Sequence, residues 1–455
     1  MPAGTVVCFY SYKGGVGRTF ALANVAAALA GWGYRVLCID WDLEAPGLSQ
    51  YFRTWVEPSV GGLLDLVEAV AAGDDAPQSL VPTNVPLPGL RGHLALIGPG
   101  AQDETYAGRL HSVNWSWLYQ ERGLGSVLER LRSRWTTAYD FVLVDSRTGI
   151  TDIGGICTVQ LPDVLVLMFT ANRQSLDGAI DVAQRAVLAR NHLPYDRANL
   201  MTLPIPSRFD AERQYERAVE WQSIFADNLA PLYDDWAVSG ITPQQILERT
   251  TIPYSSYWSF GEELPILLEP KKNPSLISYH LETLAALVAH RLARSELLIE
   301  SRDSFVDAAA RTGLRGGRYS WDVFISHARE TGPLAQQLAG LLSERSLRVW
   351  VDETSLRSGE NWSTSITDAL SRSQNLVVLI GTTLEAFQER EVSAFLRQRI
   401  DEQSARKVFP VLTQDTKSAV PPLLADTQYL SVHDQPLPAI ASTIAQALPE
   451  QGLTG

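Results

Sequence analysis

The sequence has few cysteines, no long apolar run and no strongly basic segment. Its three cysteines among 455 residues, Cys8, Cys38 and Cys157, lie in apolar segments without metal-like spacing. This pattern predicts buried thiols in a reducing cytoplasm and excludes a disulfide scaffold. The longest apolar runs fall far short of the roughly 20 residues of a membrane-spanning helix. The chain also enters a strand pattern almost at once, so we expect a cytoplasmic protein without a secretory signal.

Acidic residues outnumber basic ones, 51 to 38, and the net charge is −13. A negative surface repels DNA and anionic lipid, so a nucleic-acid partner is not expected and no membrane contact is predicted. The hydrophobic share of 45% is ordinary for a globular protein. At this length the chain exceeds what one hydrophobic core supports, which predicts two or more domains.

The first part of the chain alternates apolar strand-like runs with helical patterns. This alternation predicts a doubly wound parallel α/β sheet in a domain that spans residues 1–300. The proline-rich stretch 252–274 reads as ordered loop, and a helical pattern follows at 276–297. The expected strands are 5–10, 35–40, 94–97, 141–145 and 164–169.

A linker and a second α/β series follow. Residues 311–318 are rich in glycine and arginine and lack an apolar period, so we expect a linker over 301–318. Five further strand-like runs with helical patterns between them then predict a small flavodoxin-like domain over 319–450. These runs are 321–326, 347–351, 376–380, 407–412 and 429–432.

The most informative segment is YKGGVGRT at residues 12–19, a glycine-rich turn between a strand pattern and a helical pattern. Glycines let the backbone approach phosphate oxygens, and the following helix directs its free N–H groups at the same anion. The spacing is that of a P-loop, with Tyr12 in place of the first glycine and Arg18 in place of the lysine. It predicts a triphosphate cradle formed by Lys13, Gly14, Gly15, Val16, Gly17, Arg18 and Thr19.

Carboxylates follow the strands beside this loop. Asp40 and Asp42 lie at the end of the second strand, and Asp145 ends a later one. A magnesium ion and an attacking water need carboxylates at this edge of the sheet. We therefore expect Asp40 and Asp145 to hold Mg²⁺. Arg147 either contacts phosphate or pairs with a structural carboxylate.

Together these motifs resemble the MinD/ParA family of deviant Walker ATPases, a SIMIBI-like group of P-loop NTPases with the motif KGGxGK[ST]. The resemblance covers about residues 1–300. It implies that Lys13 reaches the phosphates of the partner subunit in an ATP-bridged dimer. It also implies that Thr19 is a magnesium ligand, that Asp42 positions the attacking water and that Asp145 holds magnesium through its water shell. Arg18 keeps the positive charge on a longer, planar side chain, so ATP binding is expected ahead of rapid hydrolysis.

Residues 321–328, WDVFISHA, resemble the first signature box of TIR domains. Residues 349–352, VWVD, with Leu356, Gly359 and Trp362, are similar to the second strand and loop of these domains. The resemblance covers about residues 319–440 and implies NAD contacts from the residues of the first strand-to-helix loop and from one tryptophan. These expected contacts are Ser326, His327, Ala328, Arg329 and Trp362.

Many bacterial TIR domains cleave NAD between nicotinamide and ribose with one glutamate in the helix after the third strand. The resemblance makes Glu391 the candidate for that role, with Glu385 and Glu389 as rivals. One carboxylate suits this chemistry, because nicotinamide leaves as a neutral base and the acid needs only to stabilise an oxocarbenium-like transition state. The alternative is that Glu391 lies on a solvated helix face.

The two resemblances imply an ATP-regulated TIR effector, an NAD⁺ glycohydrolase in prokaryotic defence or signalling. ATP and Mg²⁺ are the implied cofactors, and a homodimer or higher oligomer would form through ATP and TIR contacts. An unidentified trigger protein is left open as a further partner. One alternative is a non-enzymatic TIR adaptor under ATPase control. Another is a positioning ATPase, which the acidic balance disfavours.

Overall fold

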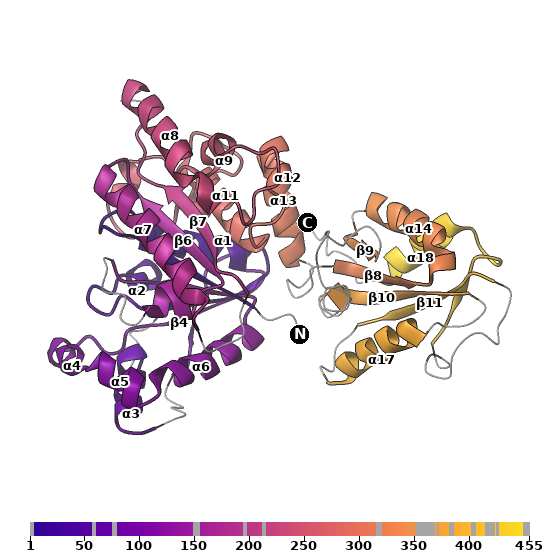
Figure 1. Ribbon diagram of the computed structural model, residues 1–455, viewed down its shortest axis with the longest axis horizontal. Helices are drawn as coiled ribbons and strands as arrows, with labels where there is room; N and C mark the ends of the chain where they lie inside the picture. The colour runs from indigo at the N-terminus through magenta and orange to yellow at the C-terminus, as the bar shows by residue number, and fades with distance from the viewer. Residues whose placement is uncertain are drawn as a thin grey trace. The chain divides into compact units, whose positions relative to one another are not determined.

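The chain folds into two units, Ala3–Leu314 and Arg315–Gly455, and each has its own sheet (Figure 1). The boundary falls within the expected linker. The computed structural model describes residues 4–56, 61–74, 80–148, 155–193, 198–211, 215–314, 321–345, 347–351, 369–370, 373–381, 386–401, 406–414, 424 and 427–448.

The sheet of the N-terminal unit has seven strands in the order β3-β4-β2-β5-β1-β6-β7. Every pair of neighbours is parallel except the short edge pair of β3 and β4. This arrangement confirms the doubly wound α/β fold. The strands are β1 (Thr5–Tyr10), β2 (Arg35–Asp40), β3 (Thr83–Asn84), β4 (His93–Ile97), β5 (Phe141–Asp145), β6 (Val164–Phe169) and β7 (Met201–Pro206).

Helices cover both faces of this sheet, because alternate strand residues point to opposite sides. Val7 and Phe9 of β1 lie in one apolar core, whereas Val6 and Cys8 lie in the other. The first core takes in α1 (Arg18–Gly31), α2 (Leu48–Phe52), α10 (Pro265–Leu268), α11 (Ile277–Ala289), α12 (Ser295–Glu300) and α13 (Arg302–Leu314). The second takes in α3 (Leu63–Ala71), α5 (Trp115–Glu121), α6 (Leu124–Ala138), α7 (Arg173–Arg190), α8 (Tyr215–Leu229) and α9 (Pro243–Thr250), and α4 (Tyr106–Ser112) precedes α5.

The cysteines lie where their apolar surroundings in the sequence predict. Cys8, Cys38 and Cys157 are buried, and none of the three is in a disulfide. Among the described residues, no helix combines the length and the apolar character needed to cross a bilayer.

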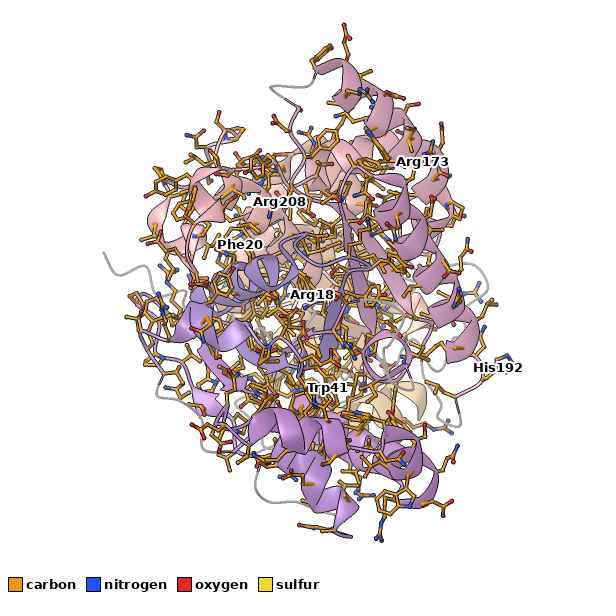
Figure 2. The ribbon with its side chains drawn as sticks, turned by 90° about the vertical axis from the view of Figure 1, so that its left-hand side faces the viewer. Arg18, Phe20, Trp41, Arg173, His192 and Arg208 are labelled. Carbon is orange, nitrogen blue, oxygen red and sulfur yellow. The ribbon has the colours of Figure 1, made fainter. Side chains whose placement is uncertain are left out.

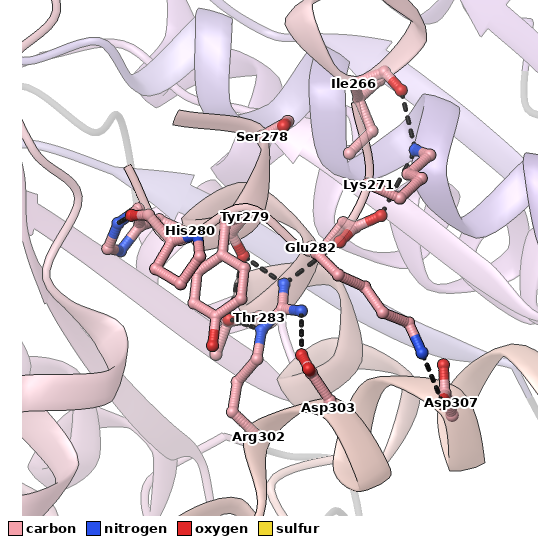
Figure 3. Close-up of polar contacts among 12 residues, drawn as sticks. Ile266, Lys271, Ser278, Tyr279, His280, Glu282, Thr283, Arg302, Asp303 and Asp307 are labelled. Carbon is pink, nitrogen blue, oxygen red and sulfur yellow. Dashed lines mark hydrogen bonds and ion pairs between the residues drawn. The ribbon is translucent and has the colours of Figure 1, made fainter. Parts of the chain in front are cut away.

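The last helix of the N-terminal unit corrects the linker prediction. Residues 302–314 form α13, and Phe305 and Ala309 on this helix are fully buried. The Arg302 side chain also fixes the helix to α11, since it lies 3.1 Å from Glu282 Oε2 and donates to Thr283 Oγ1 at 2.9 Å (Figure 3). The first part of the expected linker is therefore structured, and residues 315–320 lie outside the described residues.

His280, which Figure 3 shows close to this network, makes the N-terminal unit sensitive to acid. Burial lowers the pKa of the His280 imidazole, and the nearby Arg302 charge acts in the same direction. In the unfolded chain the ring takes up a proton near its ordinary pKa of about 6.5. Stability is therefore complete above that pH and falls as the pH drops towards the lowered pKa of the folded state. We expect a His280→Gln variant to lose less stability than the wild type between pH 7 and pH 5 in thermal melts, and an equal loss would contradict this.

The sheet of the C-terminal unit has five parallel strands in the order β12-β11-β10-β8-β9. Numbered within the unit, this is the 2-1-3-4-5 order of flavodoxin-like folds, which confirms the expected class. The elements are β8 (Trp321–His327), α14 (Gly332–Glu344), β9 (Val349–Val351), β10 (Ser373–Ile380), α17 (Ala386–Asp401), β11 (Val408–Leu412), β12 (Leu430–Ser431) and α18 (Leu437–Ala447). Helices α14 and α18 pack on one face, and α17 packs on the other.

Candidate functional sites

The glycine-rich loop forms an open cradle between β1 and α1. Gly15 and Gly17 have φ angles of 75° and 88°, a region in which side chains are strained. A Cβ atom added to Gly14, Gly15 or Gly17 would meet nothing within 4 Å, so the space above the backbone is free for a ligand. Lys13 at the start of the loop has no hydrogen bond or ion pair within the described part of the chain.

Tyr12 replaces the first P-loop glycine for a packing reason. Its ring lies against α7 at Gly178, where an added Cβ would come within 2.3 Å of the ring. The aromatic side chain therefore anchors the loop to the neighbouring helix, and Gly178 is the residue that leaves room for it.

Arg18 is buried among the carboxylates at the strand ends. Its Nε lies 2.5 Å from Asp145 Oδ1, and its Nη2 lies 2.9 Å from Asp42 Oδ2. Thr19 donates its hydroxyl to Asp145 Oδ2 at 2.6 Å. Burial alone would lower the pKa of the Arg18 guanidinium, but the charges of Asp145 and Asp42 raise it above its usual value, so Arg18 stays charged. Only 6% of the Arg18 side chain is exposed, and Figure 2 labels it near the centre of the view.

Asp40 is close to this cluster, but unlike Asp42 and Asp145 it has no cationic partner among the residues that the structure describes. Its Oδ2 accepts a hydrogen bond from the Leu48 backbone N–H at 3.0 Å. Its Oδ1 is buried and has no partner in the described part of the chain. Burial, reinforced by the charge of Asp145, raises the pKa of the Asp40 carboxyl well above its usual range. The unpartnered Asp40 oxygen can therefore bind a cation or a proton.

The donor atoms at this edge suit Mg²⁺ in type. The Thr19 hydroxyl and the carboxylates of Asp145 and Asp40 are hard oxygen ligands of the kind that magnesium prefers. Both Asp145 oxygens already accept from protein donors, and no group of three acidic, His or Cys side chains among the described residues is arranged to hold a metal. Magnesium binding at Thr19, Asp40 and Asp145 stays a prediction. Arg147 forms an ion pair with Glu44 at 2.5 Å, which is the carboxylate pairing expected as the alternative to a phosphate contact.

A cavity of about 270 Å³ opens beside the cradle, and sequence reasoning missed it. It is lined by residues from the start of α1, from the segment after β7 and from the proline-rich stretch, among them Gly17, Phe20, Arg208, Tyr254 and Trp258. Figure 2 labels Phe20 and Arg208. Arg208 has a φ of 52°, unusual for a side chain with a Cβ, and its Nη1 donates to the Gly15 carbonyl at 3.1 Å. The only signal in the sequence was the density of aromatic residues in a loop.

In the C-terminal unit, the expected catalytic glutamate meets the expected loop serine. Ser326, near the end of β8, donates its hydroxyl to Glu391 Oε2 of α17 at 2.5 Å, and both residues are buried. Strands β8 and β10 are neighbours here, and the chain order reverses between them, which is where open α/β sheets bind ligands. Glu391 is therefore not on a solvated helix face, whereas Glu389 is exposed.

The other expected NAD contacts are placed in part. His327 ends β8 and is buried, and its Nδ1 has no partner among the described residues. Ala328 and Arg329 follow it into a short 3₁₀ turn over Arg329–Thr331. Trp362 and Glu385 lie outside the described residues, as do Leu356 and Gly359.

Family models match part of each unit. A TIR domain family model matches residues 323–448, and an AAA domain model matches residues 4–50. An uncharacterized ATP-binding protein of Methanocaldococcus jannaschii is 27% identical over 190 residues, or 41% of this chain and 60% of that protein. A probable plasmid-partitioning protein ParA of Thermus thermophilus is 26% identical over 230 residues, or 50% of this chain and 65% of that protein. The chain thus spans less than two thirds of the length of these relatives.

Among solved structures, a ParA family ATPase from Chlorobium tepidum aligns with a TM-score of 0.42 at 20% sequence identity. The alignment covers 64% of this chain and 99% of the Chlorobium tepidum chain. The family matches agree with the motifs and with both observed folds. The chain joins an N-terminal MinD/ParA-like P-loop domain to a C-terminal TIR domain.

Proposed function

We propose that this protein is an ATP-controlled TIR enzyme that cleaves NAD between nicotinamide and ribose. The contact between Ser326 and Glu391 carries the proposal, because it holds a buried carboxylate at the ligand-binding edge of a parallel sheet. A role in prokaryotic defence or signalling rests on domain analogy.

Cleavage of the nicotinamide–ribose bond requires one correctly oriented carboxylate from the protein. The bond between the ribose carbon and the nicotinamide nitrogen breaks, and its electron pair leaves with nicotinamide, which becomes neutral. Water then bonds to the ribose carbon and releases a proton, which gives ADP-ribose. Glu391 would orient the ribose hydroxyls and stabilise the positive charge that develops on the sugar. Ser326 would hold the carboxylate in place by its hydrogen bond.

The N-terminal unit is proposed to bind ATP. The cradle would hold the phosphates, and the neighbouring cavity, lined by Phe20, Arg208 and Tyr254, is placed to take the nucleoside. Lys13 is available for the phosphates of a second copy, as the resemblance to deviant Walker ATPases implies. Asp42 is the proposed water-positioning acid of this site, although Arg18 holds it in this structure. Pairing of two copies would raise the local concentration of their TIR units.

Hydrogen bonds within the N-terminal unit connect the cavity to α11, and an ion pair of exposed side chains joins the preceding loop to α13. Trp258 lines the cavity and donates its Nε1–H to Glu269 at 2.6 Å, and Glu269 also accepts from the Ser278 N–H of α11 at 2.8 Å. Lys272, three residues after Glu269, pairs with Asp307 of α13 at 3.0 Å. A ligand that moves Trp258 would therefore act first on the start of α11 through Glu269.

The direct test is the release of nicotinamide from NAD by the purified full chain, measured by chromatography with and without ATP. The proposal expects release that increases with ATP. If no nicotinamide appears under any nucleotide condition, the chain is better described as a TIR adaptor under ATPase control.

A further inference from the structure

Arg18 occupies the position of the P-loop lysine, but its side chain is committed to the acidic residues of the site. It contacts Asp145 at 2.5 Å and Asp42 at 2.9 Å, and only 6% of the side chain is exposed. Thr19 supplies the donor to the second Asp145 oxygen. The arginine cation therefore lies against the same carboxylate that, in P-loop enzymes, faces a magnesium ion.

We infer that Arg18 is a resident cation of the nucleotide site, which makes ATP binding largely independent of magnesium. This inference rests on the proposal that the N-terminal unit binds ATP. Without a cation, Asp42 and Asp145 would repel the phosphates, and in most P-loop proteins a divalent ion removes that repulsion. Here the protein supplies the positive charge from its own chain.

The shape of arginine explains why lysine would not serve equally well. A guanidinium is a planar fork whose separate N–H groups can bridge two carboxylates, whereas a lysine ammonium is a compact point charge. Arg18 uses Nε and Nη2 on the two aspartates. Its Nη1 is buried and has no partner among the described residues, so one donor remains for an acceptor that a ligand brings. A small shift of the side chain would bring Nη1 to a phosphate oxygen while Nε and Nη2 keep the two carboxylates.

The test is the affinity of the wild-type full chain for a fluorescent ATP analogue, mant-ATP, in magnesium chloride and in EDTA. The inference expects the two dissociation constants to agree within about threefold. A larger weakening in EDTA would overturn it. Failure to bind in either condition would overturn the proposed nucleotide site as well, whereas binding that needs magnesium overturns this inference alone.

Two arginine variants show whether Arg18 is responsible. In Arg18→Met the unneutralised aspartates should weaken binding in EDTA by about tenfold or more, and magnesium should restore much of it. Arg35→Met is the matched control, because Arg35 begins β2, at the opposite end of the strand from the site, and pairs with Asp140. The affinity of this control variant for mant-ATP should be the same in magnesium chloride and in EDTA. If Arg18→Met does not fold, Arg18→Lys should still show increased dependence on magnesium, since the shorter, compact ammonium does not reproduce the two separate donors Nε and Nη2. Unchanged dependence in the folded variant would contradict the inference.

Discussion

Replacing Glu391 by glutamine is expected to reduce nicotinamide release from NAD by about 10²–10³-fold, the effect of removing one transition-state-stabilising group. Glutamine has the shape of glutamate and can still accept the hydrogen bond that Ser326 donates to Glu391. The fold should therefore survive, and only the negative charge that faces the developing positive charge on the ribose is lost. The rate is measured with saturating NAD and ATP.

The matched control is Glu389→Gln, two residues earlier on the same helix. Glu389 is exposed, while Glu391 is buried, so the two substitutions remove the same charge from different surroundings. We expect Glu389→Gln to retain a rate close to that of the wild type. Loss of activity in Glu389→Gln with normal activity in Glu391→Gln would show that Glu389, and not Glu391, is the catalytic carboxylate.

Replacing Arg302 by methionine is expected to lower the free energy of unfolding of the N-terminal unit by about 3 kcal/mol. Arg302 is buried, and it pairs with Glu282, donates to Thr283 and lies 3.6 Å over the Tyr279 ring (Figure 3). Its loss leaves Glu282 with Lys271, an exposed partner at 3.2 Å. This remaining partner places the expected loss at the low end of the range for a broken buried ion pair.

Denaturant unfolding of the full chain, followed through its first transition, measures this loss. Arg311→Met is the control, because Arg311 is an exposed residue on the same helix α13. We expect its effect to stay within about 0.5 kcal/mol. If Arg302→Met proved equally mild, the apolar side chains of α13 alone would hold the helix in place.

Much of the fold could be predicted because the central strands are continuous apolar runs, buried on both faces. The bounds expected for β1, β2, β5 and β6 agree with the structure. Strand β7 was missed because Pro204 and Pro206 argue against a strand, and they are tolerated here at the edge of the sheet. Helix α13 was missed because its glycine- and arginine-rich end obscured the apolar positions at Phe305 and Ala309.

The candidate sites, like the fold, could be predicted only in part from the sequence. Local motifs identified the cradle and proposed Ser326 and Glu391 separately, but their contact depends on β8 and β10 being neighbours. The pairing of Arg18 with Asp42 and Asp145 also required the strand order. The cavity could not be foreseen, since Arg208 and Trp258 come from segments far from the P-loop in sequence.

The central claim is that ATP brings two chains together and that pairing completes the NAD-cleaving site. It is tested most directly by measuring, on one full-chain sample, the mass in solution and the rate of nicotinamide release as ATP is added. The account predicts that the dimer fraction and the rate rise together, and that Lys13→Ala binds ATP but stays monomeric and slow. A wild-type chain that remains monomeric at saturating ATP and still cleaves NAD at its full rate would contradict it.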